Sequence, residues 1–233
     1  MSAKRLLYPL VTADVALFGL DPQDALRVLL VRRSEAPEAG RWALPGAVLD
    51  PERDAEIEAT ARHAFADKLR LALPHIEQVH VASGARRDPR GWSLSVVFAA
   101  LVRCDEVEAH IANKIDGVDW VDPDAAAKRR LAFDHASHVR HALAALREKV
   151  ARRALPLHLL PELFTLSHLQ RACEAVLGEP LDKSAFRRRL KTSTELEPTD
   201  EWARGHQRPA QLFRAAKGFA FRAPADPRGD DGE

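Results

Sequence analysis

The pattern of apolar residues changes near residue 151, which divides the chain into two units of different construction. Residues 1–151 alternate strand-like and helix-like segments, the order that builds a sheet covered by helices. Residues 152–222 instead hold two short helical segments followed by two strand-like ones. The tail, residues 223–233, is rich in Pro, Gly and Asp and is expected to be disordered. We therefore expect an α+β protein with two domains and a short tail.

The first unit carries the signals of a sheet with two main helices. Two apolar runs separated only by the turn-prone DPQD predict one hairpin, and two later runs joined by ARRDPRG predict another. Apolar residues three and four apart predict the helices, and Asp134 is placed to cap the second one. The expected strands are 11–19, 26–33, 76–84, 92–102 and 116–122, and the expected helices are about 54–69 and 136–151, with a loop at 41–50. The apolar stripe of the first helix consists of Ile57, Ala61, Ala64, Phe65 and Leu69.

Composition narrows the class of protein. The chain is 46% hydrophobic and 30% charged, as in ordinary globular proteins, and no apolar run reaches the roughly 20 residues of a membrane span. Cys104 and Cys173 are the two cysteines, too few for a disulfide framework or a cysteine-based zinc site. We expect a soluble cytoplasmic protein without membrane partners.

The segment GAVLDPERDAEIEATARHAFADKLRL contains the first helix and resembles the Nudix box. That box reads G, five residues, E, seven residues, R-E, an aliphatic, any residue, E-E, any residue, G and an aliphatic. Gly46 and Glu52 fit this spacing, whereas Thr60 stands where the arginine belongs unless a two-residue insertion brings Arg62 into register. The segments RRDPRGWSLSVVFAALV and LAFDHASHVRHAL are similar to those of Nudix proteins related to ADP-ribose hydrolases. The resemblance implies a Nudix α/β/α sandwich for residues 1–151.

The catalytic half of this box is depleted. With Arg62 as the anchor, the acidic positions of the family fall on His63, Ala66 and Asp67. Magnesium and manganese take oxygen ligands, so Ala66 supplies none and His63 is a poor substitute. We expect no catalysis, no metal and no cofactor. The alternative is a divergent hydrolase of ADP-ribose-like substrates that relies on Asp67 with Glu52 or Glu56.

The second unit has the layout of a winged helix-turn-helix. Thr165 can cap a helix at 166–177 that stops at Gly178, and Asp182 can cap a second helix at 183–191. Strand-like residues 194–198 and 209–215 then bracket 199–208 as a wing. With the Nudix-like unit before it, this segment resembles the C-terminal domain of the Nudix-related transcriptional regulators, which include NrtR-type repressors of NAD biosynthesis. The resemblance implies effector binding, often of ADP-ribose, a homodimer and binding to double-stranded operator DNA.

The second helix carries a cationic face. Residues 152–222 contain 13 Lys and Arg against 8 Asp and Glu, a surplus that favours a polyanionic partner. Phe186 and Leu190 are expected to face inward, while a polar stripe lies on the other side. A solvated helix face is the plainer alternative. The residues assigned to DNA are Lys183, Ser184, Arg187, Arg188, Arg189 and Lys191 in the helix, with Arg189 on a phosphate, and Arg204, His206 and Arg208 in the wing.

Four residues of the first unit are candidates for effector binding: Arg33, Trp42, Arg87 and Arg90. The last two either hold a diphosphate through their guanidinium groups or pin their hairpin through local ion pairs. Trp42 either borders the pocket or packs in the core. The run His135, His138, His141 drifts around its helix, so the three are not expected to meet one metal ion.

These signals together predict a ligand-responsive transcriptional regulator, most simply a repressor. Effector binding would shift a dimer between two placements of its winged helices, with the helix at 136–151 as the connection, and this requires different effector affinities for the two placements. One rival is the divergent hydrolase. The other is an adaptor that uses its wing for protein contacts and does not bind DNA.

Overall fold

A computed structural model describes residues 8–69, 73, 75–105, 107, 117–203 and 209–221 of the chain. Its first unit is built around a seven-stranded sheet with the order β3-β2-β1-β6-β5, in which β4 pairs with β1 and β7 with β2. The central pair β1 and β6 is parallel and the other pairs are antiparallel. The strands are β1 (Leu10–Leu20), β2 (Leu26–Arg32), β3 (Trp42–Ala43), β4 (Gly46–Val48), β5 (Ile76–Asp88), β6 (Gly91–Leu101) and β7 (Val118–Val121).

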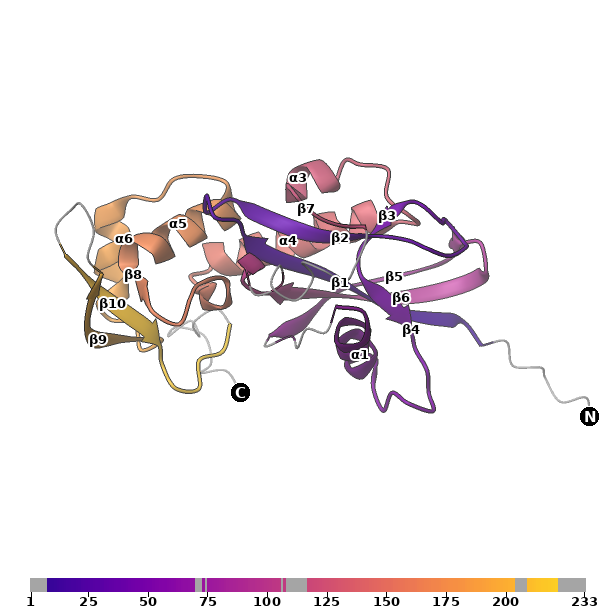
Figure 1. The fold of residues 1–233 in the computed structure, drawn as a ribbon, viewed down its shortest axis with the longest axis horizontal. Coiled ribbons are helices and arrows are strands. Elements are labelled where there is room, and N and C mark those ends of the chain that lie inside the picture. The colour runs from indigo at the N-terminus through magenta and orange to yellow at the C-terminus, as the bar shows by residue number, and fades with distance from the viewer. Residues whose placement is uncertain are drawn as a thin grey trace, which may run out of the picture.

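Helices cover both faces of this sheet. Figure 1 shows α1 (Ile57–Leu69) on one side, with α3 (Pro123–Ala126) and α4 (His135–Ala151) on the other. Alternate residues of β1 enter two different clusters, because side chains along a strand point to opposite faces. Val15 and Leu17 pack with Phe65 of α1, whereas Ala16 and Phe18 join the cluster that contains α4. This arrangement is the predicted Nudix sandwich.

The second unit is the predicted winged helix. Its helices are α5 (Leu166–Leu177) and α6 (Lys183–Leu190), and its small sheet has the order β8-β10-β9, with β8 (Phe164–Thr165), β9 (Leu196–Ala203) and β10 (Ala210–Ala215). All three predicted end signals are present. Thr165 Oγ1 accepts from His168 N at 3.1 Å, Asp182 Oδ1 accepts from Ala185 N at 2.7 Å, and Gly178 ends α5 in the left-handed conformation.

Three expectations about the strands were wrong. The loop expected at 41–50 holds β3 and β4, which are too short to give a sequence pattern but pair with β2 and β1. Strand β5 runs on to Asp88, so Arg87 lies in the strand rather than in the turn. Strand β9 runs to Ala203, past the expected end at residue 198, since pairing with β10 outweighs the low strand propensity of TDE.

The segment after α4 is a packed joint. Residues 154–157 are buried, a short 3₁₀ turn η1 (Leu157–Leu159) follows, and one hydrophobic cluster includes Leu146 of α4, Leu155, Leu169 of α5 and Phe186 of α6. The expected boundary at 151/152 therefore falls where the two units share a core.

Polar contacts also cross this joint. Arg147 of α4 donates from Nε to Val176 O at 3.0 Å, and Asp24 in the β1–β2 turn accepts from Arg171 at 2.6 Å and lies 3.0 Å from His168 Nε2. The first unit and the winged helix are thus held together by both apolar and polar contacts. Within the described ranges no helix is long and apolar enough to cross a bilayer. The tail expected to be disordered lies outside the described residues.

Candidate functional site

The Nudix-like segment keeps the structural half of its motif. Gly46 pairs with Asp14 across β4 and β1, and a Cβ atom there would lie 2.4 Å from Ala13 O and 2.5 Å from Asp14 Oδ1. Only glycine fits such a close approach. On α1, Ile57 is half-buried, and Ala61, Ala64 and Phe65 are buried, as the predicted stripe requires. The side chain of Leu69 lies outside the described residues.

The polar residues of this segment bind one another. His63 Nδ1 lies 2.6 Å from Asp54 Oδ1, and Thr60 Oγ1 donates to Asp54 Oδ2 at 2.7 Å. These two hydrogen bonds, that of Thr60 first, hold the pKa of the Asp54 carboxyl below its usual value. Asp67 forms an ion pair with Arg53 at 2.7 Å. Arginine therefore already neutralises the one carboxylate that α1 offers at the expected metal positions.

The other residues of the box are exposed. Arg62 forms an ion pair with Glu58 at 2.8 Å and donates to Leu73 O at 2.7 Å, while Glu52 lies in the turn before α1 and Ala66 faces solvent. Within the described residues, no group of three potential metal ligands forms on α1. The donor atoms present do not suit a pair of hard divalent cations.

The four candidate effector residues come together around residues 132–135. Trp42 O accepts from Ala132 N at 2.8 Å, and the Trp42 ring packs against the core, as one of its two interpretations predicted. The guanidinium carbon of Arg33 lies 4.8 Å from the ring centre of Phe133, and that of Arg90 lies 6.0 Å from it. Phe133 is the centre of this cluster, although no sequence pattern marks it as a candidate.

Phe133 has a backbone φ of +51°. Bulky residues rarely adopt this conformation, and such outliers gather at functional sites because they cost free energy. The outlier here turns the chain between Leu131 and α4 and leaves a half-buried ring close to two cations. An aromatic face and nearby guanidinium groups are what a nucleotide needs for a base and a diphosphate.

The three arginines differ in what they already bind. Arg87 donates from Nε and Nη2 to Asp134 at 3.0 and 2.8 Å and from Nη1 to Ser93 at 3.1 Å, and its side chain is 10% exposed. Arg90 donates three hydrogen bonds of 2.8–3.3 Å to the carboxylate of Asp88 in the same hairpin. Among the described residues, Arg33 donates from Nε alone, to Pro37 O at 2.9 Å. Arg33 thus keeps both terminal nitrogens for a ligand.

Asp134 begins α4 but does not cap it with its side chain, contrary to expectation. Its carboxylate instead receives Arg87 and lies 3.3 Å from His138 Nε2. Burial acts to raise the pKa of Asp134, but the hydrogen bonds from His138 and Arg87 outweigh burial and hold that pKa well below its usual value. The start of α4 is therefore tied to the β5–β6 hairpin by a charged contact.

A buried polar centre lies beneath this contact. Asp14 of β1, His135 and His138 place ligand atoms within 4.8 Å of one another, and Ser95 donates to Asp14. Leu44 N donates to His135 Nδ1 at 2.9 Å, so a neutral His135 carries its proton on Nε2, which lies 3.6 Å from Asp14. This protonation state leaves the Nε2 lone pair of His135 unavailable to a metal.

The third histidine of the run lies apart, as predicted. His141 stacks on His80 with 3.8 Å between ring centres. Asp14, by contrast, was missed, although a single acid inside an apolar strand is a usable signal of a buried polar site.

Acid should destabilise the protein through His135. Burial lowers the pKa of its imidazole to about 4, below the ordinary value of 6.5. The folded state thus binds fewer protons, so stability is fully present above pH 6.5 and is lost as the pH falls toward 4, by up to about 3 kcal/mol. Urea unfolding at pH 7.5, 5.5 and 4.5 measures the slope. His135→Asn keeps an acceptor for Leu44 and should flatten that slope, and an unchanged slope would contradict this assignment.

Helix α6 has the predicted two sides. Phe186 and Leu190 are buried, whereas Lys183, Ser184, Arg187, Arg188 and Lys191 are exposed. Arg187 reaches Ser167 of α5 at 3.3 Å, and Arg189 is half-buried against Phe186, with 4.9 Å between its guanidinium carbon and the ring centre. Arg204, His206 and Arg208 of the wing lie outside the described residues.

Comparison with known proteins agrees with both units. Residues 10–142 match the family described as NUDIX domain, and residues 156–215 match the NrtR DNA-binding winged helix domain. The chain is 41% identical over 217 residues to the "ADPR responsive transcriptional repressor NtrR" of Acinetobacter baylyi, covering 93% of this chain and 86% of that protein. The chain belongs to the NrtR family.

Structures of the NrtR family resemble the whole chain and its first unit. Shewanella oneidensis NrtR complexed with a 27mer DNA is 34% identical, with a TM-score of 0.80 over 88% of this chain and 93% of that one. The NUDIX domain of the same protein complexed with ADP ribose is 33% identical, with a TM-score of 0.52 over 60% of this chain and 90% of that one. The order of Nudix unit and winged helix is therefore that of NrtR.

Proposed function

We propose that this NrtR-family chain is a transcriptional repressor whose binding to operator DNA is controlled by ADP-ribose. The observation that carries this proposal is the similarity over 93% of the chain to an ADPR responsive transcriptional repressor. The exposed cationic face of α6 supports DNA as the partner, because such a face fits a major groove and its phosphates. The active form is a homodimer, since two winged helices read two half-sites, and it acts on chromosomal DNA in the cytoplasm.

ADP-ribose binds at the Phe133 cluster in this proposal. The effector carries a diphosphate and an adenine, which match the free terminal nitrogens of Arg33 and the ring of Phe133. Arg87 and Asp134 hold the cluster in shape and do not contact the ligand. Arg90, whose charge Asp88 balances, borders the site.

Helix α4 carries the signal toward DNA. It begins beside the Phe133 cluster and runs for 17 residues, about 25 Å at 1.5 Å per residue. Near its far end Arg147 binds the last turn of α5, and the shared core joins α4 to α6. A small shift at Asp134 therefore moves the winged helix, provided that ADP-ribose binds one placement better than the other.

Duplex binding with and without ADP-ribose tests the proposal. Fluorescence anisotropy would measure binding to labelled duplexes. Their sequences would be taken from the DNA upstream of the genes that neighbour the gene of this protein. We expect ADP-ribose to weaken binding by about 5- to 100-fold, the range of typical coupling free energies. Ribose 5-phosphate, which lacks adenine and the diphosphate, is the control. Tight binding that ADP-ribose leaves unchanged would remove the effector assignment, and no salt-dependent duplex binding would favour the protein adaptor.

The Nudix unit retains no pyrophosphatase chemistry in this proposal. Two observations support this: Asp67 forms an ion pair with Arg53, and His63 and Ala66 stand where the Nudix box has carboxylate metal ligands. Incubation of ADP-ribose with magnesium or manganese should release no AMP. AMP release that disappears on Asp67→Ala and on Glu52→Ala would establish the hydrolase instead.

A further inference from the structure

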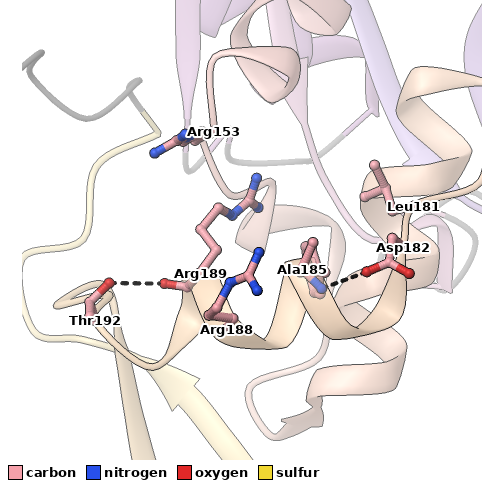
Figure 2. Close-up of a pocket in the computed structure, with 8 residues that line it drawn as sticks. Arg153, Leu181, Asp182, Ala185, Arg188, Arg189 and Thr192 are labelled. Atoms are coloured by element: carbon pink, nitrogen blue, oxygen red, sulfur yellow. Dashed lines mark hydrogen bonds between the residues drawn. The ribbon is translucent and has the colours of Figure 1, made fainter.

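A basic pocket lies between the end of α4 and the flank of α6. It has a volume of about 570 Å³ and is lined by Arg153, Asp182, Ala185, Arg188 and Arg189, among others. Figure 2 shows the guanidinium group of Arg189 between those of Arg188 and Arg153. Two of these arginines come from α6, and the third comes from the turn that leaves α4.

In the described part of the chain, the three cations have no ion-pair partner, although the Glu195 carboxylate attracts Arg189 electrostatically. None of their guanidinium groups forms an ion pair or donates a hydrogen bond there, and the buried Nη2 of Arg189 has no acceptor. Asp182 lines the pocket, but its Oδ1 already caps α6. Burial, with the positive charge of Arg153 nearby, lowers the pKa of Arg189. Buried donors in native proteins normally have an acceptor, and an anion bound in the pocket would supply one for Arg189 Nη2.

The backbone conformation of Arg153 is a second, independent indication that its side chain has a functional role. After the C-cap residue Arg152, Arg153 has a φ of +77°, with hydrogen bonds from Arg153 N to Val150 O and from Ala154 N to Lys149 O, each 3.0 Å. This is a Schellman motif with arginine at the position that favours glycine. An L side chain is strained there, and such strain is tolerated mainly where the residue has another role.

We propose that Arg153, Arg188 and Arg189 form a phosphate-binding pocket that holds a backbone phosphate of the bound duplex. The pocket lies on the flank of α6, beside the exposed face that enters the groove, and Arg188 belongs to both. A helix in the major groove has phosphates along its flanks. This inference rests on the proposed DNA binding and adds a contact from outside the helix-turn-helix.

This contact would place one DNA-binding residue, Arg153, at the end of α4. Arg153 follows the last residue of α4 by two positions, while the first residue of α4 adjoins the Phe133 cluster. Because Arg153 follows α4 and Arg189 belongs to α6, a shift of α4 that is not fully transmitted to α6 would change the distance between these two guanidinium groups in the pocket. ADP-ribose would then change the affinity for DNA through this pocket as well as through the placement of α6.

Arg153→Gly is the decisive variant because it removes the guanidinium group and the backbone strain together. We expect its thermal unfolding midpoint to equal or exceed that of the unmodified protein. Its affinity for the duplex should fall about 3- to 10-fold, and the slope of log K against log salt should become shallower by about one. Arg152→Gln is the matched control. It removes the neighbouring charge, which pairs with Glu148 at 2.7 Å outside the pocket, and should change affinity less than 2-fold.

A titration with inorganic pyrophosphate distinguishes the source of the phosphate. If pyrophosphate raises the unfolding midpoint of the unmodified protein but not of Arg153→Gly, while duplex affinity is equal for both, the pocket holds a free phosphate compound. Equal affinity, equal salt slope and equal pyrophosphate response would overturn the pocket altogether. Failure of the unmodified chain to bind any duplex would instead count against the proposed function, and the pyrophosphate titration would still decide the pocket.

Discussion

Replacing Arg187 and Arg188 together with alanine should lower the affinity for the operator duplex by about 100-fold or more. Both side chains are exposed on α6, opposite the buried Phe186 and Leu190. An arginine that reads a guanine or clamps a phosphate contributes about 1–3 kcal/mol, so the loss of two exceeds 100-fold at the middle of that range. Titration by anisotropy at fixed salt measures the effect.

The control is Arg140→Ala with Arg152→Ala, which removes the same charge from α4 and its C-cap residue. Both arginines are exposed and make only local contacts, with Ser137 and Ala127 in one case and Glu148 in the other. The control should bind the duplex nearly normally, and both double variants should keep their fold and their affinity for ADP-ribose. Operator affinity that is unchanged in the α6 variant would refute its assignment as the recognition helix.

The fold was predictable where local chemistry decides it. Thr165, Gly178 and Asp182 mark helix ends by hydrogen bonds to residues three or four positions away, so the sequence contains the whole signal. The long strands and helices follow from periodicity. The short β3 and β4 could not be found this way, because strands of two or three residues exist only through their partners.

The effector cluster was predictable only in part. Arginines at strand ends are visible in the sequence, but Phe133 and Asp14 act through contacts with residues far along the chain. Arg153 was missed for another reason: its left-handed backbone breaks a local preference, and sequence patterns record preferences. Two of the four non-glycine residues with a left-handed backbone in the described ranges, Phe133 and Arg153, adjoin an end of α4 and a proposed ligand site.

Arg87→Ala and Arg33→Met should separate stability from effector recognition. Arg87 is almost buried and balances Asp134, so its loss leaves a partly buried carboxylate beside His138. Breaking such a pair typically costs 3–5 kcal/mol, and the partial exposure of Asp134 places the expected loss near about 3 kcal/mol. Urea unfolding at pH 7.5 measures it. Arg33 makes one hydrogen bond to a nearby carbonyl, so Arg33→Met should change the free energy of unfolding by less than about 1 kcal/mol.

For the affinity for ADP-ribose, we expect Arg33→Met to have the larger effect and Arg87→Ala the smaller one. Arg33→Met removes the free guanidinium nitrogens beside Phe133, and a charge-assisted contact of about 1.5–3 kcal/mol corresponds to about 10- to 100-fold in affinity. Arg32→Met is the matched control, since Arg32 is exposed and donates to Gly40 O at 3.1 Å within the same loop. Calorimetric titration of ADP-ribose should separate the two variants. Equal affinities for Arg32→Met and Arg33→Met would place the effector elsewhere, because Arg33 is the one of these two neighbours whose guanidinium group lies over the Phe133 ring in the described structure.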